Sequence, residues 1–168
     1  MQQKKSLLNK KAPLKKNELE VIVLNSTHLK LCIDLDRIAL NGLWTKEHWE
    51  KELLDKNRIC LGVIEDLKLI AVASGWTIVN EFHLTLIGVH PLYRKKGIGK
   101  LVLSMLLSEA KRKGSEIATL EVDKKNNAAI KLYENYGFKT VGIREKYYKN
   151  GNDALIKTIS LKASTNVI

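Results

Sequence analysis

Residues 89–100, with the sequence VHPLYRKKGIGK, form the stretch of this chain best suited to chemistry. Three consecutive cations, Arg94 to Lys96, precede Gly97 and Gly99, and a helical pattern of apolar residues starts at Ile98. The first N–H groups of a helix have no partner within it, and together with the helix dipole they attract anions. Glycine lets the backbone approach such a ligand without a Cβ in the way. The loop is therefore predicted to hold a phosphate group.

The spacing within this loop excludes the two commonest phosphate-binding motifs. A dinucleotide fingerprint needs a third glycine three residues after Gly99, and that position is Val102. A Walker loop needs Ser or Thr after Gly-Lys, whereas Leu101 follows Lys100. The pattern that remains is Val-x-Pro-x-Tyr-Arg-x-x-Gly-Ile-Gly, with a strand-like segment before it and a helix after it.

This pattern resembles the coenzyme-A-binding signature of the GCN5-related N-acetyltransferase (GNAT) superfamily. The resemblance implies that the loop holds the pyrophosphate of acetyl-CoA, the acetyl donor, through its amides and cations. It also places three strand residues along the pantetheine and makes the Val89 amide the group that polarises the acetyl oxygen. The residues assigned to the cofactor in this way are Ile87, Gly88, Val89, Arg94, Lys95, Lys96, Gly97, Ile98, Gly99, Lys100 and Asn126. The plainer alternative is an exposed basic turn that only caps a helix.

A second block, residues 120–138, carries the pattern Leu-Glu-Val…Asn-x-Ala-Ala-x-x-Leu-Tyr-x-x-x-Gly-Phe. It resembles the RimI-like branch of the superfamily, whose enzymes acetylate the N-terminal alanine of a small-subunit ribosomal protein. The resemblance implies that Glu121 takes the proton of the acceptor amine, directly or through water, and that Tyr133 protonates the departing thiolate. An α-ammonium group has a pKa of about 8 and a phenol one of about 10, which suits these roles. Judged without the resemblance, Glu121 is a solvent-facing strand residue and Tyr133 a core aromatic.

The acceptor side is predicted from Trp44, Tyr147 and Tyr148, which resemble the substrate-facing residues of that branch. Trp44 equally suits packing, and the two tyrosines equally suit the two faces of a strand. Leu43 stands where the branch commonly has proline, and Asn152 where it commonly has an acidic residue. Both departures lie on the substrate side, so they weaken the assignment to an alanine terminus more than the assignment to acetyl-CoA.

The predicted function is therefore acetyl transfer from acetyl-CoA to a protein N-terminal α-amine, with the N-terminal alanine of a ribosomal protein as the expected acceptor. Two alternatives remain open. One is an acetyltransferase for a lysine side chain or a small amine such as a polyamine. The other is a noncatalytic module that associates with the ribosome or RNA and retains cofactor binding.

The elements that must position these residues follow from periodicity and turn signals. Strands are expected at residues 21–24, 58–65, 69–79, 82–89, 116–122, 138–148 and 154–161, and helices at residues 28–40, from 45 onward, 98–113 and 126–136. Thr27 is expected to cap the first helix and Thr45 the second. This order fits an α/β (α+β) fold in which helices cover both faces of a mixed sheet. The resemblance implies a GNAT-type, mostly antiparallel central sheet of about seven strands.

Composition favours one soluble domain, expected over residues 18–168 of the 168, with 45% hydrophobic and 28% charged residues. There is no apolar run of about 18 residues that would predict a membrane span. Cys32 and Cys60 lack metal or redox spacing and suit a reducing cytoplasm. The four histidines form no metal-ligand cluster, so no metal site is predicted.

The net charge of +11 is concentrated at the N-terminus, where residues 1–17 hold six lysines and no acid. This composition predicts a basic, disordered tail. It is expected either to contact a ribosome or RNA through nonspecific attraction to phosphates or to serve only as a charged, solubilising extension. The sequence leaves the oligomeric state open.

Overall fold

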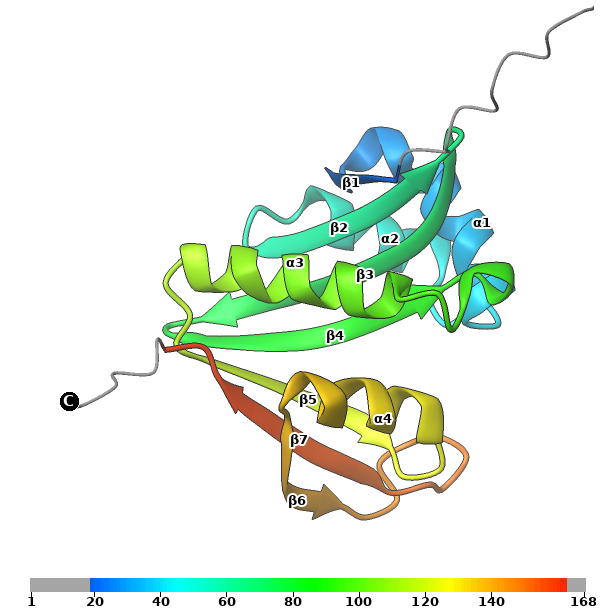
Figure 1. Cartoon of the computed structure of the whole chain (residues 1–168). Coiled ribbons are helices and arrows are strands. Elements are labelled where there is room, and N and C mark those ends of the chain that lie inside the picture. The colour runs from blue at the N-terminus through cyan, green and yellow to red at the C-terminus, as the bar shows by residue number, and fades with distance from the viewer. Residues whose placement is uncertain (1–18, 163–168) are drawn as a thin grey trace, which may run out of the picture.

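The computed structural model of the chain describes residues 19–162, so the predicted tail over residues 1–17 lies outside the described residues. Seven strands form one sheet in the order β1-β2-β3-β4-β5-β7-β6, and every neighbouring pair is antiparallel except β4 and β5 (Figure 1). The strands are β1 (Glu20–Val23), β2 (Arg58–Glu65), β3 (Lys68–Ile78), β4 (Glu81–Val89), β5 (Ile117–Asp123), β6 (Lys139–Arg144) and β7 (Ala154–Ser160). The prediction of a mixed, mostly antiparallel sheet of about seven strands is confirmed.

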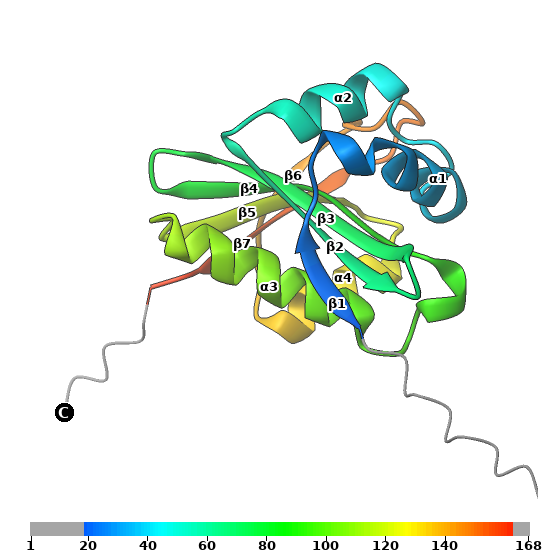
Figure 2. The same ribbon diagram turned by 90° about the horizontal axis from the view of Figure 1, so that it is seen from above.

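Helices cover both faces of the sheet. Figure 2 shows α1 (Leu29–Ala39) and α2 (Lys46–Leu54) on one face and α3 (Ile98–Arg112) and α4 (Asn127–Tyr136) on the other. Two short 3₁₀ turns, η1 (Ser26–His28) and η2 (Pro91–Tyr93), precede α1 and α3. Each face has its own apolar core: one centres on Trp49 of α2, the other on Leu103 and Leu106 of α3. Burial of these side chains holds the layers together.

A β-bulge in β4 changes which side chains face each core. The pairing of β3 with β4 passes from Ser74↔Leu86 to Gly75↔Leu84, so Thr85 is the extra residue. Its hydroxyl donates to the Ser74 carbonyl oxygen over 3.1 Å. Leu84 packs with the α3 core and Leu86 with the α1–α2 core, although strict alternation would place both on one face. The bulge thus lies in the middle of the sheet, and beyond it the side chains of β4 face the opposite side from the one that alternation would give.

Strands β4 and β5 pair only at their starts. The parallel register runs from Glu81↔Ile117 to Leu84↔Leu120 and then stops, and Figure 1 shows the two strands diverging beyond it. The remainder of β4 therefore leaves one edge without a partner strand, at the place where β5 presents Glu121. This divergence brings the bulge, the open edge and Glu121 into one region.

Two local predictions were wrong. Asn25, rather than Thr27, caps the first helical segment, because its side-chain oxygen accepts the Thr27 N–H over 3.0 Å and the η1 turn comes before α1. The sixth strand ends at Arg144 instead of continuing to residue 148, so Tyr147 and Tyr148 lie in the loop between β6 and β7. By contrast, Thr45 caps α2 as predicted, accepting the His48 N–H over 3.2 Å.

Candidate active site

A cavity of about 390 Å³ opens on the α1–α2 face of the sheet, beside the point where β4 and β5 part. It brings together four residues that the sequence singled out, which are Trp44, Glu121, Tyr147 and Tyr148. Six lining residues were not predicted, and these are His48, Arg58, Trp76, His83, Leu84 and Thr85. The cavity combines aromatic walls with a few ionisable groups, the composition expected of a site that binds a small polar group.

Glu121 lies at the inner end of this cavity. On β5, Leu120 and Val122 point into the α3 core, so alternation turns Glu121 to the opposite face. Its Oε2 lies 2.9 Å from Nε2 of His83, and its Oε1 lies 3.3 Å from Nη2 of Arg144. The Glu121 side chain is only 8% exposed. The carboxylate is therefore held between two nitrogen groups and is largely covered by them.

Aromatic rings form the outer walls. Trp44 stacks on His48 with ring centroids 4.4 Å apart and planes 7° from parallel. Tyr147 and Tyr148 meet edge to face at 5.1 Å on the loop between β6 and β7. Burial, followed by the negative charge of Asp123, raises the pKa of the Tyr148 phenol to about 12. The hydroxyl of Tyr148 therefore stays protonated across the physiological range.

Buried Asp36 fixes the loop that carries Trp44. This α1 side chain, in a residue only 1% exposed, accepts the backbone N–H groups of Leu43 and Trp44, each over 2.9 Å, and the indole N–H of Trp49 over 2.8 Å. Three donors satisfy a carboxylate that has been removed from water, where an unpaired charge would be costly. Asp36 thus ties α1, α2 and their connecting loop to the position of Trp44.

We expect Asp36→Asn to destabilise the protein by roughly 3 kcal/mol, because an amide presents an N–H where one of the three donors needs an acceptor. Urea unfolding measures this loss. The KM for the acceptor should also rise, because the loop carrying Trp44 loosens. Asp34→Asn, on the exposed side of the same helix where Asp34 pairs with Lys30, is the matched control and should cost under about 0.5 kcal/mol. Equal stability of the two variants would contradict the role given to Asp36.

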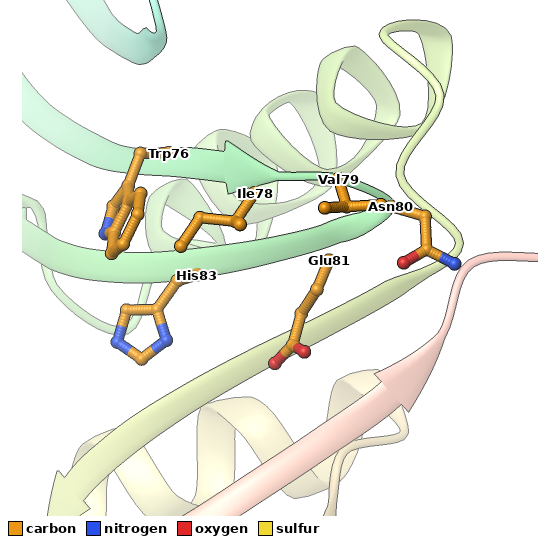
Figure 3. A pocket seen from close by; sticks show the side chains of 6 residues that line it. All are labelled: Trp76, Ile78, Val79, Asn80, Glu81 and His83. Atoms are coloured by element: carbon orange, nitrogen blue, oxygen red, sulfur yellow. The ribbon is translucent and has the colours of Figure 1, made fainter.

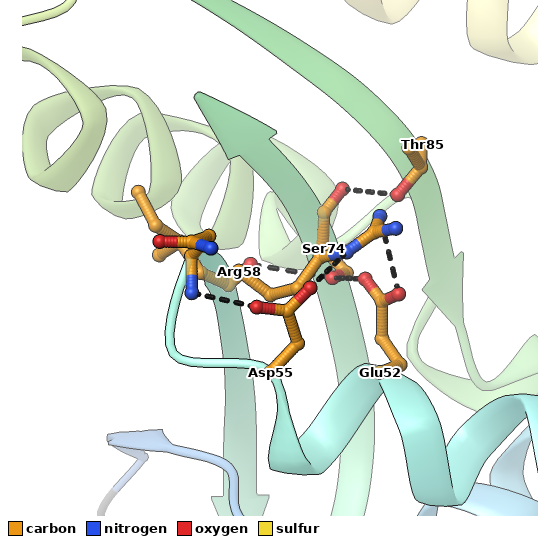
Figure 4. Close-up of polar contacts among 7 residues, drawn as sticks. Glu52, Asp55, Arg58, Ser74 and Thr85 are labelled. Atoms are coloured by element: carbon orange, nitrogen blue, oxygen red, sulfur yellow. Dashed lines mark hydrogen bonds and ion pairs between the residues drawn. The ribbon is translucent and has the colours of Figure 1, made fainter. Parts of the chain in front are cut away.

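Arg58 forms another part of the wall through a buried polar cluster (Figure 4). Its guanidinium lies 3.3 Å from Oε2 of Glu52 and 3.5 Å from Oδ2 of Asp55, and it sits 5.4 Å over the ring of Trp76. Glu52 is almost fully buried and also accepts the Ser74 hydroxyl. The cluster anchors α2 to β2 and β3 and holds a cation at the cavity edge.

A second pocket, of about 550 Å³, lies at the end of the β3–β4 hairpin (Figure 3) and shares Trp76 and His83 with the cavity. Trp76 pairs with His83 and Ile78 with Glu81, so alternation places these four side chains on one face of the hairpin. A bound chain can therefore extend beyond His83 along the sheet surface.

The predicted phosphate loop has the geometry of an anion site. Gly97 is the N-cap of α3 with φ +82°, a left-handed conformation that glycine adopts at no steric cost. The first helical bond runs from the Leu101 N–H to the Gly97 carbonyl over 2.9 Å, so the N–H groups of Ile98, Gly99 and Lys100 lack helical acceptors. A Cβ at Gly99 would meet Leu132 and Val89 at ordinary distances of 3.5 and 3.6 Å. Packing alone therefore does not require glycine there.

The cations of this loop do not all remain available. Arg94 donates from Nε to the Val89 carbonyl and from Nη2 to the Ala39 carbonyl, each over 3.0 Å, so it braces the loop against β4 and α1. Lys96 lies 5.5 Å over the ring of Tyr93. Lys95 and Lys100 form no ion pair within the described residues 19–162. Attraction of phosphate thus rests on these two lysines and on the helix N-terminus.

The open edge of β4 presents amides next to this loop. The His90 N–H bonds to the Ile70 carbonyl, and Val89 pairs with Ala71. In an antiparallel ladder this makes Val89 a position whose own N–H and C=O point away from β3. Ile87 has the same orientation two residues earlier, whereas the amide of Gly88 faces β3. The free N–H groups on this edge are therefore those of Ile87 and Val89.

Tyr133 lies on the other face of the sheet, in the α3 core, against the ring of Phe138 at 5.7 Å. It does not line the cavity, and its hydroxyl has no hydrogen-bond partner within the described part of the chain. Burial, with a smaller contribution from Tyr148, raises the pKa of this phenol well above its usual range. Tyr148, the source of the smaller contribution, itself lines the cavity.

Asn126 has a structural contact that was not anticipated. It is the N-cap of α4, and its Oδ1 accepts the Ala129 N–H over 3.1 Å. The side chain of Asn126, which was predicted to contact the cofactor, therefore also caps α4, the helix that carries Tyr133.

Sequence reasoning missed Asp36, Arg58 and His83. A buried aspartate within a helix has no local signature, since its three donors come from residues 7 to 13 positions away. His83 did carry a weak signal, because it alternates with the buried residues Phe82 and Leu84 and so faces the opposite side of β4.

The described residues 19–162 hold no group of three His, Cys, Asp or Glu side chains placed to ligate a metal ion. None of their helices combines the length and the apolar character needed to cross a membrane.

Comparison with known proteins gives consistent matches. Residues 31–138 match the model of the acetyltransferase (GNAT) family. A Bacillus subtilis (strain 168) protein is 30% identical over 130 residues, which cover 76% of this chain and 86% of that protein. The N-alpha-acetyltransferase RimI of Mycobacterium tuberculosis is 34% identical over 116 residues, covering 66% of this chain and 72% of that protein. The crystal structure of the ribosomal-protein-S18-alanine N-acetyltransferase from Escherichia coli superposes with a TM-score of 0.81 and 26% identity, covering 90% of this chain and 99% of that one.

Proposed function

The chain belongs to the acetyltransferase (GNAT) family, whose acetyl donor is acetyl-CoA, and from this premise we propose that it acetylates the N-terminal α-amine of a protein. The observation that carries the proposal is the cavity in which Glu121 lies behind the aromatic residues Trp44, Tyr147 and Tyr148. We propose the N-terminal alanine of a ribosomal protein as the acceptor, because relatives are named for that reaction or for N-alpha-acetylation.

The residues on the donor side fit acetyl-CoA. Bound there, it supplies a thioester carbonyl that an amine can attack. The free N–H groups of Ile98, Gly99 and Lys100 suit its pyrophosphate. The pairing of β4 with β5 ends at Leu84↔Leu120, so Glu121 and Thr85 are the first residues beyond it on the two strands. Each further residue along β4 adds about 3.3 Å, so on the open edge the Ile87 N–H lies nearer to Glu121 along the strand than the Val89 N–H does. We therefore assign polarisation of the thioester carbonyl to the Ile87 amide and hydrogen bonding farther along the donor to the Val89 amide.

The residues on the acceptor side fit a chain end better than a long side chain. The cavity is lined by aromatic rings and opens along the hairpin pocket of Figure 3, which gives room for the residues that follow the reacting one. Glu121 supplies the negative charge that favours loss of a proton from the incoming ammonium group. The cationic Arg58 at the cavity edge disfavours polyamines, which carry several positive charges.

Tyr133 is proposed to protonate the departing thiolate, since its raised pKa keeps the phenol protonated until charge develops on the sulfur. Replacing it by Phe should lower kcat by about 30-fold to 100-fold. The fold should persist, because its hydroxyl bonds to no other described residue.

Tyr133→Phe should also change the response to alkali. Unfolded phenols ionise near pH 10, whereas Tyr133 and Tyr148 ionise higher when folded, so wild-type stability falls as the pH rises above about 10. The variant should lose less stability between about pH 9 and about pH 11.5, as measured by urea midpoints. An equal loss in both proteins would contradict the burial of this phenol.

The test of the proposed function is coenzyme A release by the purified protein with acetyl-CoA and a panel of acceptors. The panel holds peptides that begin with alanine, serine or a bulky residue, an N-terminally blocked peptide with one lysine, and spermidine. We expect kcat/KM to be highest for an alanine-starting ribosomal peptide. Faster reaction of the lysine peptide or spermidine would indicate a different acceptor. No release with any amine, together with salt-sensitive binding of RNA, would favour a noncatalytic module.

The cellular setting stays a proposal as well. An enzyme that modifies newly made ribosomal proteins would act in the cytoplasm, and the two free cysteines, both buried, suit that compartment. Contact of the lysine-rich residues 1–17 with a ribosome or RNA would place the enzyme near its substrate.

A further inference from the structure

His83 and Glu121 form a pair in the cavity, and the imidazole is its more exposed member. Its side chain is 29% exposed, whereas that of Glu121 is 8% exposed. Both carboxylate oxygens of Glu121 already face nitrogen groups, Nε2 of His83 and Nη2 of Arg144. The carboxylate is therefore more covered than the imidazole, although both line the cavity.

The 2.9 Å separation of His83 Nε2 from Glu121 Oε2 fixes how the ring carries its proton. Two lone pairs repel each other at this distance, so Nε2 must bear a hydrogen that points at the carboxylate. In the neutral imidazole, Nδ1 is then the acceptor. No described residue provides a hydrogen-bond partner for Nδ1. The ring is thus oriented by a carboxylate at one nitrogen and has a free lone pair at the other.

We propose that His83 is the catalytic base for the acceptor amine and that Glu121 is the positioning residue that orients it and stabilises its charged form. This rests on the proposed function and assigns the proton acceptor within it. Nδ1 takes one proton from the ammonium group and passes it to solvent. The C–N bond then forms and the C–S bond breaks, and Tyr133 gives its proton to the departing sulfur. The amine nitrogen loses a second proton, which restores the phenol of Tyr133. Acetylated amine, free coenzyme A and one released proton balance the reaction.

The surroundings of His83 are compatible with this proton transfer. Trp76 on β3 packs against the ring at 6.0 Å and screens one side from water. The charged or titratable groups around it from the packed elements are Glu81 on β4, Arg58 on β2, His48 on α2, Glu121 on β5, Arg144 on β6, and Tyr147 and Tyr148 in the following loop. Among these, Glu121 is the one in direct contact with an imidazole nitrogen, so a proton gained at Nδ1 completes an ion pair with it.

The test is chemical rescue of His83→Ala by free imidazole, with acetyl-CoA and the best peptide from the acceptor panel. We expect kcat/KM to fall about a hundredfold and to recover in proportion to added imidazole, while the Kd for acetyl-CoA stays within about threefold of wild type. His48→Ala, which removes another imidazole from the same cavity, is the matched control and should show no rescue.

Each outcome separates this proposal from the one on which it rests. If the wild type acetylates no amine, both are overturned. If the wild type is active and His83→Ala stays within about threefold of it, Glu121 itself is the base and only the present proposal fails. A large loss without rescue would mean that His83 serves only to pack the cavity, which also overturns the proposal.

Discussion

Replacing Glu121 by Gln is expected to lower kcat about 10³-fold while the Kd for acetyl-CoA changes by less than about threefold. The Glu121 carboxylate contacts both His83 and Arg144, so its negative charge acts on both side chains at the acceptor side of the site. An amide has the same shape but no charge to stabilise an imidazolium or to favour deprotonation of the amine. Single-turnover kinetics with a saturating peptide would measure the chemical step directly.

Glu81→Gln provides a matched control for this loss. Glu81 lies two residues before His83 on β4, where its carboxylate accepts the Thr119 hydroxyl over 2.6 Å at the hairpin end. Glu81→Gln removes one negative charge, as Glu121→Gln does, without touching the Glu121 cluster. We expect its kcat to fall less than about threefold. Comparable losses in the two variants would show that Glu121 acts only through the general electrostatic field.

Replacing Gly97 by Val is expected to weaken acetyl-CoA binding by about 10² to 10³-fold, which corresponds to about 3 to 4 kcal/mol. Gly97 has φ +82° and starts α3, and a β-branched residue does not tolerate that conformation. The loop must therefore rearrange, and the N–H groups of Ile98 and Gly99 move away from the phosphate position. Isothermal titration with acetyl-CoA measures the change.

Gly114→Val is the control for backbone strain, because Gly114 follows the other end of α3 with φ +96° and equally open surroundings. Both variants should lose similar stability on thermal unfolding, since both force a side chain into the left-handed region. Only Gly97→Val should lose affinity for acetyl-CoA. Weakened binding in Gly114→Val as well would trace the effect to helix stability rather than to the loop.

Much of the fold was predictable because its signals are local. Several of them are encoded within a few neighbouring residues: the continuous apolar runs of β2 and β3, the alternation along β4 and β5, the glycine stop at Gly114 and the turn at Asn150–Gly151. The cofactor loop was predictable for the same reason, since spacing and residue type suffice to place amides at a helix start. The family model over residues 31–138 confirms the family that the loop pattern predicted, and the roles of the individual loop residues stay predictions.

The acceptor side was less predictable because long-range contacts create it. The bulge at Thr85 has no sequence signature, yet it decides which face Leu86 and Gly88 occupy. Asp36 becomes important only when α2 packs beside α1, and His83 only when β5 brings Glu121 within 2.9 Å. Arg94 shows the converse: its type suggested a phosphate ligand, whereas two of its donors bind backbone carbonyls.

The central claim, transfer of an acetyl group to a protein N-terminal α-amine, is tested most directly by locating the acetyl group on a single peptide. The peptide begins with alanine, follows a ribosomal protein N-terminus and contains an internal lysine, so it offers both kinds of amine. After incubation with the protein and acetyl-CoA, fragmentation in the mass spectrometer assigns the modified nitrogen. We predict that the N-terminal fragment ions carry the acetyl group and the lysine stays free. Acetylation of the lysine alone, or of neither amine, would contradict the account.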